Sequence, residues 1–175
     1  MKKKYIILLL LLCTFTLFTG CTNNKKATKK EEKKEVVDPT LVKINDLEFH
    51  LKKETSYKNL KYTIVEDFQE TIMSRYIQYK YNQEDGTNLL FFRIFVYDGK
   101  SIDEVRTDLG IDASITTTDG KNKNLEFKKL VTPRDDGGTM NFYFITKDNT
   151  VYAVSFISKY DIKDFEEKVV NSLYF

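Results

Sequence analysis

The sequence IQYKYNQEDGTNLLFFRIFVY, residues 77–97, carries one of the clearest strand patterns in the chain. Its first part alternates apolar and polar residues, as a strand with one buried face does. Asp85-Gly86 then supplies a turn, because Asp-Gly between two such runs favours a hairpin. From Leu89 onward both alternating sets are apolar, which predicts a central strand covered on both sides. The stretch therefore predicts an antiparallel pair inside a larger sheet whose two faces are both packed.

Two helices are predicted to cover this sheet. The first begins at a capping box formed by Ser101 and Glu104 and ends at Gly110. The second follows Asp161, its expected N-cap, because apolar residues recur at helical spacing after it. The apolar face of this second helix consists of Ile162, Phe165, Val169 and Leu173.

Further strands are predicted from runs of β-branched and aromatic residues. They are residues 47–51, 125–132, 139–147 and 151–158. Residues 57–74 combine strand-like and helix-like spacing, so their type stays open, and residues 112–124 are expected to form an exposed connection. The order of strands, helix, strands and helix predicts an α+β domain. In it, an antiparallel sheet is packed between helices as an α/β/α sandwich.

Near the C-terminus, residues 141–145, a turn and residues 151–157 are followed by residues 164–175, in which a helix leads into a short segment of Ser and aromatic residues. This pattern resembles the end of PsbP-like domains. Residues 47–110 share only the order of elements with that family. The resemblance implies a curved antiparallel sheet between helices and an accessory role without catalysis. It carries no site residues over to this chain.

The charge of the chain is nearly balanced. There are 28 basic and 26 acidic residues, and loss of Lys2, Lys3 and Lys4 with a leader would leave 25 basic residues against the 26 acidic ones. Nucleic acid is not an expected partner, because binding to its backbone needs a concentrated positive field. Cys13 and Cys21 both belong to the N-terminal leader region, so no disulfide, cysteine nucleophile or thiolate metal site is expected in the domain.

Residues 1–20 have the anatomy of a signal peptide, with a basic start and an apolar run that is too short for a permanent membrane helix of about 20 apolar residues. The sequence LFTGC, residues 17–21, resembles the lipobox of bacterial lipoproteins, although Phe18 stands where Leu is usual. The resemblance implies acylation of Cys21. Two acyl chains make such an anchor stable, which predicts a place on the extracytoplasmic face of the cell membrane.

The remaining chain divides into a tether and one domain. Residues 21–40, which begin with the lipidated cysteine, are charged and almost free of apolar residues, so they cannot offset the entropy of ordering. They are predicted to be a flexible tether. Residues 41–175 are predicted to be a single α+β domain, for which the hydrophobic content of 41% is sufficient.

Acidic and histidine residues offer candidates for chemistry, each with an ordinary explanation. His50, the single histidine, is expected on a strand surface. Residues 135–138, DDGG, and Asp85-Gly86 lack the ligand spacing of an EF-hand and are expected to form turns. Two pairs of adjacent carboxylates are expected on solvated faces, because neighbours in sequence do not point at one atom. They are Glu66 with Asp67, and Glu166 with Glu167.

Four tyrosines on neighbouring predicted strands offer a further candidate. They are Tyr76, Tyr79, Tyr81 and Tyr97. Together they could stack on the sugars of wall polymers, although a core and its edge explain them better. The common nucleotide, hydrolase, metalloprotease and penicillin-recognising signatures do not occur. No catalytic, cofactor-binding or metal-binding residue is therefore assigned, and no cofactor is expected.

Two hypotheses on function remain. The first is a non-catalytic binding or accessory module of the cell envelope, held at the bilayer by acylated Cys21 and directed at an envelope protein or wall component. Its sign would be an exposed apolar patch. The second is a small-ligand carrier or an enzyme with a site of carboxylates and tyrosines. Its sign would be a deep pocket with convergent polar groups.

Overall fold

The structure, a computed structural model, describes residues 38–52, 56–57, 60–61, 63–70, 75–83 and 87–175. The predictions for the leader, for Cys21 and for the tether up to residue 37 lie outside the described residues. The same holds for the Asp85-Gly86 turn and for the side chains of Glu66 and Asp67.

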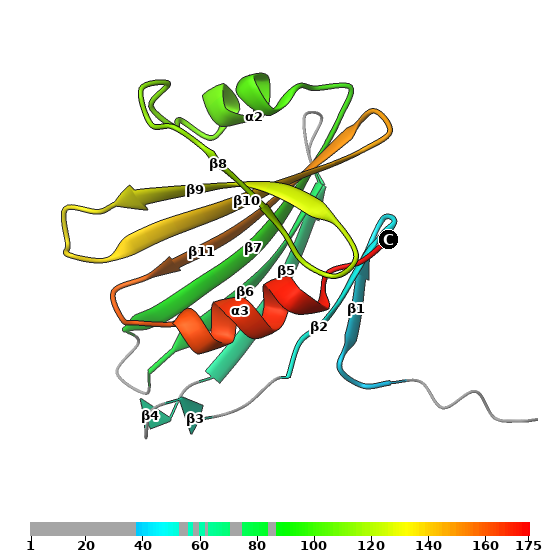
Figure 1. The fold of residues 1–175 in the computed structure, drawn as a ribbon. Helices are drawn as coiled ribbons and strands as arrows, with labels where there is room; N and C mark the ends of the chain where they lie inside the picture. Colours follow the sequence, from blue (N-terminus) through cyan, green and yellow to red (C-terminus); the bar gives the residue numbers. More distant parts are fainter. Residues whose placement is uncertain (1–37, 53–55, 58–59, 62, 71–74, 84–86) are drawn as a thin grey trace, which may run out of the picture. The chain divides into compact units, whose positions relative to one another are not determined.

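A seven-stranded antiparallel sheet forms the centre of the domain, in the order β5-β6-β7-β11-β10-β9-β8 (Figure 1). Its strands are β5 Thr63–Glu70, β6 Arg75–Asn82, β7 Asn88–Asp98, β8 Thr118–Lys121, β9 Glu126–Pro133, β10 Thr139–Lys147 and β11 Thr150–Ser158. The predicted pairing of β6 with β7 is confirmed, with Tyr79 opposite Phe92. β7 also pairs with β11, so it is the interior strand that its two apolar faces predicted.

Two short hairpins accompany the sheet. Strand β1, Leu41–Ile44, pairs with β2, Leu47–His50, and β3, Ser56–Tyr57, pairs with β4, Leu60–Lys61. The predicted strand at residues 47–51 is confirmed, whereas its partner β1 was not predicted. Within residues 57–74 the structure forms strands, including β5, where the sequence left the type open.

Two details of the prediction need correction. Residues 112–124 were expected to form an exposed connection, but this largely exposed segment also contains the edge strand β8, which pairs with β9. The last helix, α3, spans Lys163–Ser172, and its N-cap is Ile162 rather than Asp161. The Asp161 carboxylate still accepts a hydrogen bond from the Lys163 amide at 3.1 Å, so it binds the first turn from one position further out.

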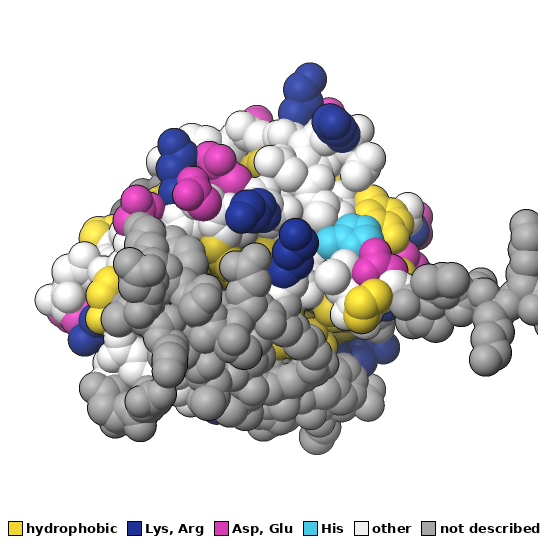
Figure 2. Space-filling view, turned by 90° about the horizontal axis from the view of Figure 1, so that it is seen from below, with side chains coloured by type: hydrophobic (Ala, Val, Ile, Leu, Met, Phe, Trp, Pro, Cys, Tyr) yellow, Lys and Arg dark blue, Asp and Glu magenta, His cyan; other side chains and the backbone are white. Residues whose placement is uncertain are grey.

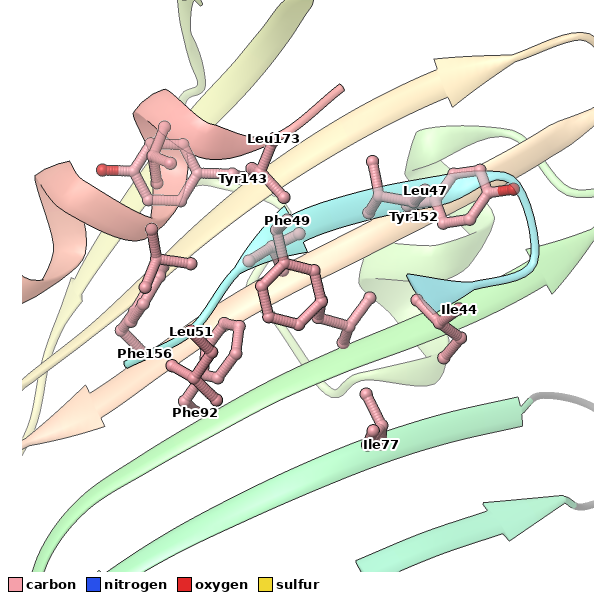
Figure 3. Close-up of a cluster of buried hydrophobic side chains, with 14 of the residues drawn as sticks. Ile44, Leu47, Phe49, Leu51, Ile77, Phe92, Tyr143, Tyr152, Phe156 and Leu173 are labelled. Carbon is pink, nitrogen blue, oxygen red and sulfur yellow. The ribbon is translucent and has the colours of Figure 1, made fainter. Parts of the chain in front are cut away.

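One face of the sheet packs against α3 and the β1–β2 hairpin. Phe92 lies in the centre of the buried side chains on this face and has no exposed surface. Its ring is stacked on that of Phe156, with 5.0 Å between the ring centres, and meets that of Phe49 edge-on at 5.5 Å (Figure 3). The predicted apolar face of α3 is part of the same cluster. The chain end closes this side, because Tyr174 forms a bridge with Glu48 of β2 in which each amide donates to the other's carbonyl.

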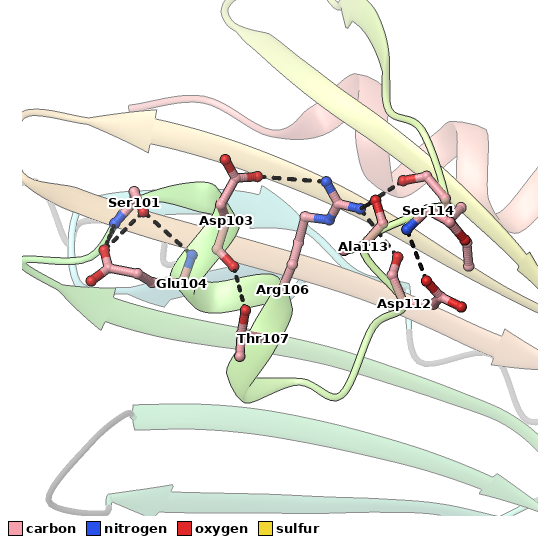
Figure 4. Close-up of polar contacts among 9 residues, drawn as sticks. Ser101, Asp103, Glu104, Arg106, Thr107, Asp112, Ala113 and Ser114 are labelled. Atoms are coloured by element: carbon pink, nitrogen blue, oxygen red, sulfur yellow. Dashed lines mark hydrogen bonds and ion pairs between the residues drawn. The ribbon is translucent and has the colours of Figure 1, made fainter.

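The opposite face packs against α2, Ile102–Asp108, through a smaller cluster that includes Val105 and Ile111. The predicted capping box is confirmed, because Glu104 accepts a hydrogen bond from the Ser101 amide at 2.8 Å while Ser101 Oγ accepts one from the Glu104 amide at 3.3 Å (Figure 4). Gly110, with φ of 68°, ends the helix as predicted. The predicted α+β class, with one helix against each face of an antiparallel sheet, is confirmed.

Candidate functional site

Glu166 is the side chain whose position departs most from the sequence-based prediction. It was expected on a solvated face together with Glu167, but only 5% of it is exposed, whereas Glu167 is exposed as predicted. The spacing held a signal for this difference. Glu166 follows Ile162 by four residues and precedes Val170 by four, so it belongs to the inward stripe of α3.

Three side chains from the sheet donate hydrogen bonds to the Glu166 carboxylate. Lys129 Nζ of β9 lies 3.0 Å from Oε1, and Asn141 Nδ2 of β10 lies 2.6 Å from Oε2. The hydroxyl of Tyr143 in β10 also donates to Oε1. Strand pairing places these donors together, because Lys129 is directly opposite Tyr143 in the β9–β10 register. We call Lys129, Asn141, Tyr143 and Glu166 the Glu166 cluster.

The environment of Tyr143 favours its neutral form. Burial, followed by the hydrogen bond to the Glu166 carboxylate, raises the pKa of Tyr143 well above its ordinary value. The ammonium group of Lys129 lies 5.0 Å from the centre of the Tyr143 ring, within the range of a cation–π contact. Tyr143 is therefore held as a hydrogen-bond donor with a fixed direction, rather than as a group that exchanges its proton.

The Glu166 cluster lines a pocket of about 410 Å³ between the start of α3 and the neighbouring ends of β9, β10 and β11. Gly137, Gly138 and Thr139 close one side, and Ser158 and Tyr160 contribute to another. Tyr160 is 42% exposed, which makes it an accessible aromatic surface at this pocket. A pocket with an aromatic wall and several convergent polar groups is the sign expected of a small-ligand site.

A second, larger pocket of about 740 Å³ lies along β8 and β9 and extends to Ile102 of α2. Its charged lining residues, which include Asp119 and Lys128, are exposed, and these two pair with each other at 2.8 Å. Surface ion pairs of this kind contribute little to stability or specificity. The pocket at Glu166 is the stronger candidate, because Glu166, Asn141 and Tyr143 are buried and hydrogen-bonded to one another.

His50 is at the surface, as predicted. Its Nδ1 lies 3.0 Å from the Thr40 hydroxyl and 3.3 Å from the Asp38 carboxylate. The Ser172 hydroxyl is nearby, but it accepts from the His50 backbone amide rather than contacting the ring. A triad needs the hydroxyl and the carboxylate on different ring nitrogens. These contacts instead join His50, at the end of β2, to the residues just before β1 and to Ser172 at the end of α3.

The acidic turn at residues 135–138 is explained by backbone geometry, as predicted. Asp136 accepts hydrogen bonds from Arg134 and from the Gly138 amide, and Gly137 has a φ of 79°. The side-chain hydrogen bond from Arg134, followed by that from the Gly138 amide, lowers the pKa of Asp136 to about 2. In the part of the chain that the structure describes, no group of three His, Cys, Asp or Glu residues is placed to hold a metal ion.

The four tyrosines considered for sugar stacking do not form one platform. Tyr79 and Tyr81 are buried in the cluster beneath α3, whereas Tyr97 is buried on the opposite face. Tyr76 shares that opposite face and contacts Phe95 at 5.4 Å. The interpretation of these residues as core and core edge is the one that the structure supports.

The surface of the domain carries charges of both signs. Figure 2 shows basic and acidic side chains interspersed over the described part of one face, without a field of a single sign. Among the described residues, no helix is both long enough and apolar enough to span a bilayer.

No protein-family model, curated protein sequence or solved structure matches the chain.

Proposed function

We propose that this protein is a lipid-anchored, extracytoplasmic binding module of the cell envelope, and that the pocket at Glu166 is its ligand site. The leader at residues 1–20, the lipobox-like sequence before Cys21 and the charged tether support the anchor. In this proposal, acylated Cys21 anchors the protein in the bilayer. The ligand of the domain is a wall component or a group on an envelope protein. The module acts by binding and does not catalyse a reaction.

The buried Glu166 cluster is the observation that carries the ligand site. Desolvation of a buried ion pair offsets much of its Coulomb attraction, and apolar residues of similar volume often stabilise a fold as well or better. Stability alone therefore does not explain why Glu166, Lys129 and Asn141 converge beside a pocket. Fixed polar groups next to an open volume are what recognition of a polar molecule requires.

Binding fits the cluster better than proton transfer does. A general acid or base needs a pKa near the working pH and a proton that it can exchange with substrate. The raised pKa of Tyr143 moves it away from that range, and its hydroxyl is already committed to Glu166. The charges around the pocket pair with one another, as Lys159 does with Asp136 at 3.7 Å. This balance favours an uncharged or zwitterionic ligand.

An enzyme that uses the same groups is the second candidate function. It is favoured by one observation, the direct contact between the carboxylate of Glu166 and the hydroxyl of Tyr143. It would require a ligand that displaces this contact and frees one of the two groups. A tyrosine side chain that titrated near neutral pH in the presence of ligand would support this candidate and contradict ours.

Membership of the PsbP-like fold is part of the proposal. Its support is the C-terminal element order, in which the β10–β11 hairpin is followed by α3 and then by a short extended segment. In that segment Tyr174 pairs with Glu48, so the final residues add to the β1–β2 hairpin. An accessory role without catalysis is what the resemblance implies for this chain.

The anchor is tested by intact mass spectrometry of the protein purified from bacterial membranes. We expect a mature chain that begins at Cys21 and carries the mass of the acyl groups. The Cys21→Ala variant should be uncleaved or released from the membrane. A soluble, unacylated wild-type product would contradict the anchor.

The ligand site is tested by a fragment screen on the ¹⁵N-labelled full mature chain, with N-acetylglucosamine and alanyl-alanine among the uncharged and zwitterionic probes. Probes that bind should shift the amide signals of Gly137, Gly138 and Thr139, and Glu166→Gln should abolish these shifts. Asp164→Asn removes a charge of the same sign from an exposed residue of α3 that does not line the pocket, so it serves as the control. Shifts that persist in Glu166→Gln, or that cluster elsewhere, would contradict the assignment.

A further inference from the structure

A row of polar side chains crosses the sheet face on which α2 packs. Gln78 of β6, Arg93 of β7 and Ser155 of β11 are directly opposite one another in the registers of the two strand pairs. Side chains opposite each other in an antiparallel pair lie on one face and within contact distance. Gln78 is 4% exposed and Ser155 is 1% exposed, so the row lies within the sheet surface rather than at its edge.

Arg93 in this row has no acidic partner among the described residues. Its Nε donates to Gln78 Oε1 at 2.5 Å, and its guanidinium lies 4.9 Å from the centre of the Phe91 ring. These contacts fix the plane of the guanidinium, while its two terminal nitrogens have no acceptor on the described residues. Desolvation by burial lowers the pKa of Arg93, as expected when no counter-charge compensates.

The other three arginines of the chain all have a carboxylate partner. Arg75 pairs with Asp98 at 2.6 Å, Arg106 with Asp103 at 3.5 Å, and Arg134 with Asp136 at 3.0 Å. A guanidinium offers a planar fork that matches a carboxylate with two parallel hydrogen bonds. Of the four arginines, Arg93 is the one without a carboxylate partner among the side chains that the structure describes.

The surroundings of Arg93 are apolar and partly accessible. Tyr76, Phe91, Phe95 and Ile157 share this face of the sheet and are each only half-buried. The Ser155 hydroxyl is buried and has no hydrogen-bond partner among the described residues. A buried hydroxyl without a partner is unfavourable, so it is an unused group of the kind that a bound oxyanion could satisfy.

We propose that this sheet face binds a small carboxylate with an apolar body, whose two oxygens pair with the terminal nitrogens of Arg93 while its body lies on Phe91 and Phe95. The aromatic side chains give the site an apolar surface, and Arg93 gives it one fixed charge of opposite sign. The site is separate from the pocket at Glu166, because the two lie on opposite faces of the sheet. It does not depend on the function proposed for that pocket.

The test is a titration of the full mature chain with benzoate at constant ionic strength. The chemical shift of the Arg93 Nε–H group is monitored by NMR. Benzyl alcohol has a similar apolar body without the charge, and sodium chloride supplies an anion without the fork geometry. We expect benzoate to shift the signal with saturation and the other two to leave it unchanged. An equal response to chloride or benzyl alcohol would overturn the proposal, as would no response to benzoate.

Variants at two arginines separate the fork from general charge. Arg93→Gln should weaken benzoate binding about tenfold or more, read from amide shifts at Phe91 and Ser155, because a charge-assisted pair is lost. Arg75→Gln removes the same charge from the same sheet, at a residue that already has a carboxylate, and should leave the affinity within about twofold. Equal losses in the two variants would overturn the proposal.

One further variant addresses a competing counter-charge. Asp67 of β5 is opposite Gln78 in the backbone register of β5 and β6. We expect Asp67→Asn to leave the benzoate affinity unchanged. A rise of about tenfold in Asp67→Asn would show that Arg93 is neutralised within the chain, and the proposal would then be wrong.

Discussion

The two faces of the central sheet differ in how completely they are covered. Beneath α3 and the β1–β2 hairpin, large aromatic side chains such as Phe49, Phe92 and Phe156 are fully buried. On the opposite face α2 spans only seven residues, and aromatic side chains such as Phe91 and Phe95 are half-buried. The face beneath α3 therefore supplies most of the packing energy, while the opposite face leaves part of its aromatic surface accessible.

Polar groups interrupt the packing of both faces in different ways. On the α3 face the charge of Glu166 is matched inside the chain by Lys129, next to a pocket. On the α2 face Arg93 has no such match among the described residues. The first arrangement can recognise a ligand without net charge, and the second favours an anion.

Substitution of two neighbouring phenylalanines of β7 compares how much the packing of each face contributes to stability. Phe92→Ala removes a fully buried ring and should lower the free energy of unfolding by about 3 to 5 kcal/mol. Phe91→Ala removes the adjacent ring, which is half-buried on the other face, and should lower it by about 1 kcal/mol. Urea denaturation of both variants provides the measurement. Equal losses in the two variants would contradict the conclusion that the face beneath α3 supplies most of the packing energy.

Glu166 and Glu167 form a second matched pair on α3. Glu166→Ala should lower the free energy of unfolding by about 2 kcal/mol, because it leaves the amide of Asn141 and the ammonium group of Lys129 without their acceptor. This is less than for a fully buried ion pair, since the Lys129 side chain is 35% exposed. Glu167→Ala should change it by less than about 0.5 kcal/mol. A comparable loss at Glu167 would mean that burial does not distinguish the two residues.

Removal of the capping box tests how much α2 contributes to the stability of the sheet face on which it packs. Ser101→Ala removes the side-chain acceptor of the Glu104 amide and should lower the free energy of unfolding by about 1 kcal/mol. Hydrogen exchange should then quicken at the amide of Val105 while that of Val169 in α3 is unaffected. Faster exchange in both helices would show that the two faces unfold together rather than separately.

The pH dependence of stability should report on Tyr143. Its pKa is higher in the folded state than its ordinary value of 10.0, so folding favours the protonated form. This contribution is complete below pH 10 and is lost as the pH rises above it. Urea denaturation between pH 8 and pH 11 should therefore show a smaller difference between wild type and Tyr143→Phe at the alkaline end. A difference that stays constant would contradict the raised pKa.

Much of the architecture could be predicted because its signals are local. The alternation and turn at residues 77–97 indicated the β6–β7 hairpin, and the Ser101–Glu104 pair indicated where α2 begins. Strand β8 was missed because its four residues, TDGK, carry little apolar pattern and become a strand only through pairing with β9. The open type of residues 57–74 has a similar reason, since β5 is defined by its pairing with β6.

The candidate sites were beyond sequence reasoning for a related reason. Glu166 occupies an inward position of a helix, which the spacing of α3 could have revealed, but its donors could not be identified in this way. Lys129 is 37 residues away from it in sequence. Likewise, the row of Gln78, Arg93 and Ser155 depends on the register of three strands, two of which are far apart in the chain.

Local sequence patterns were sufficient to predict the α+β class and the strands and helices with strong periodicity, and they indicate a leader, an acylated Cys21 and a tether, which remain predictions. The tertiary structure alone decided which polar side chains converge, and on which face. The physical reason is that periodicity and capping act over a few residues, whereas a site is formed by strand register and packing between distant segments. Glu166 and Arg93 therefore acquire their neighbours only in the folded chain.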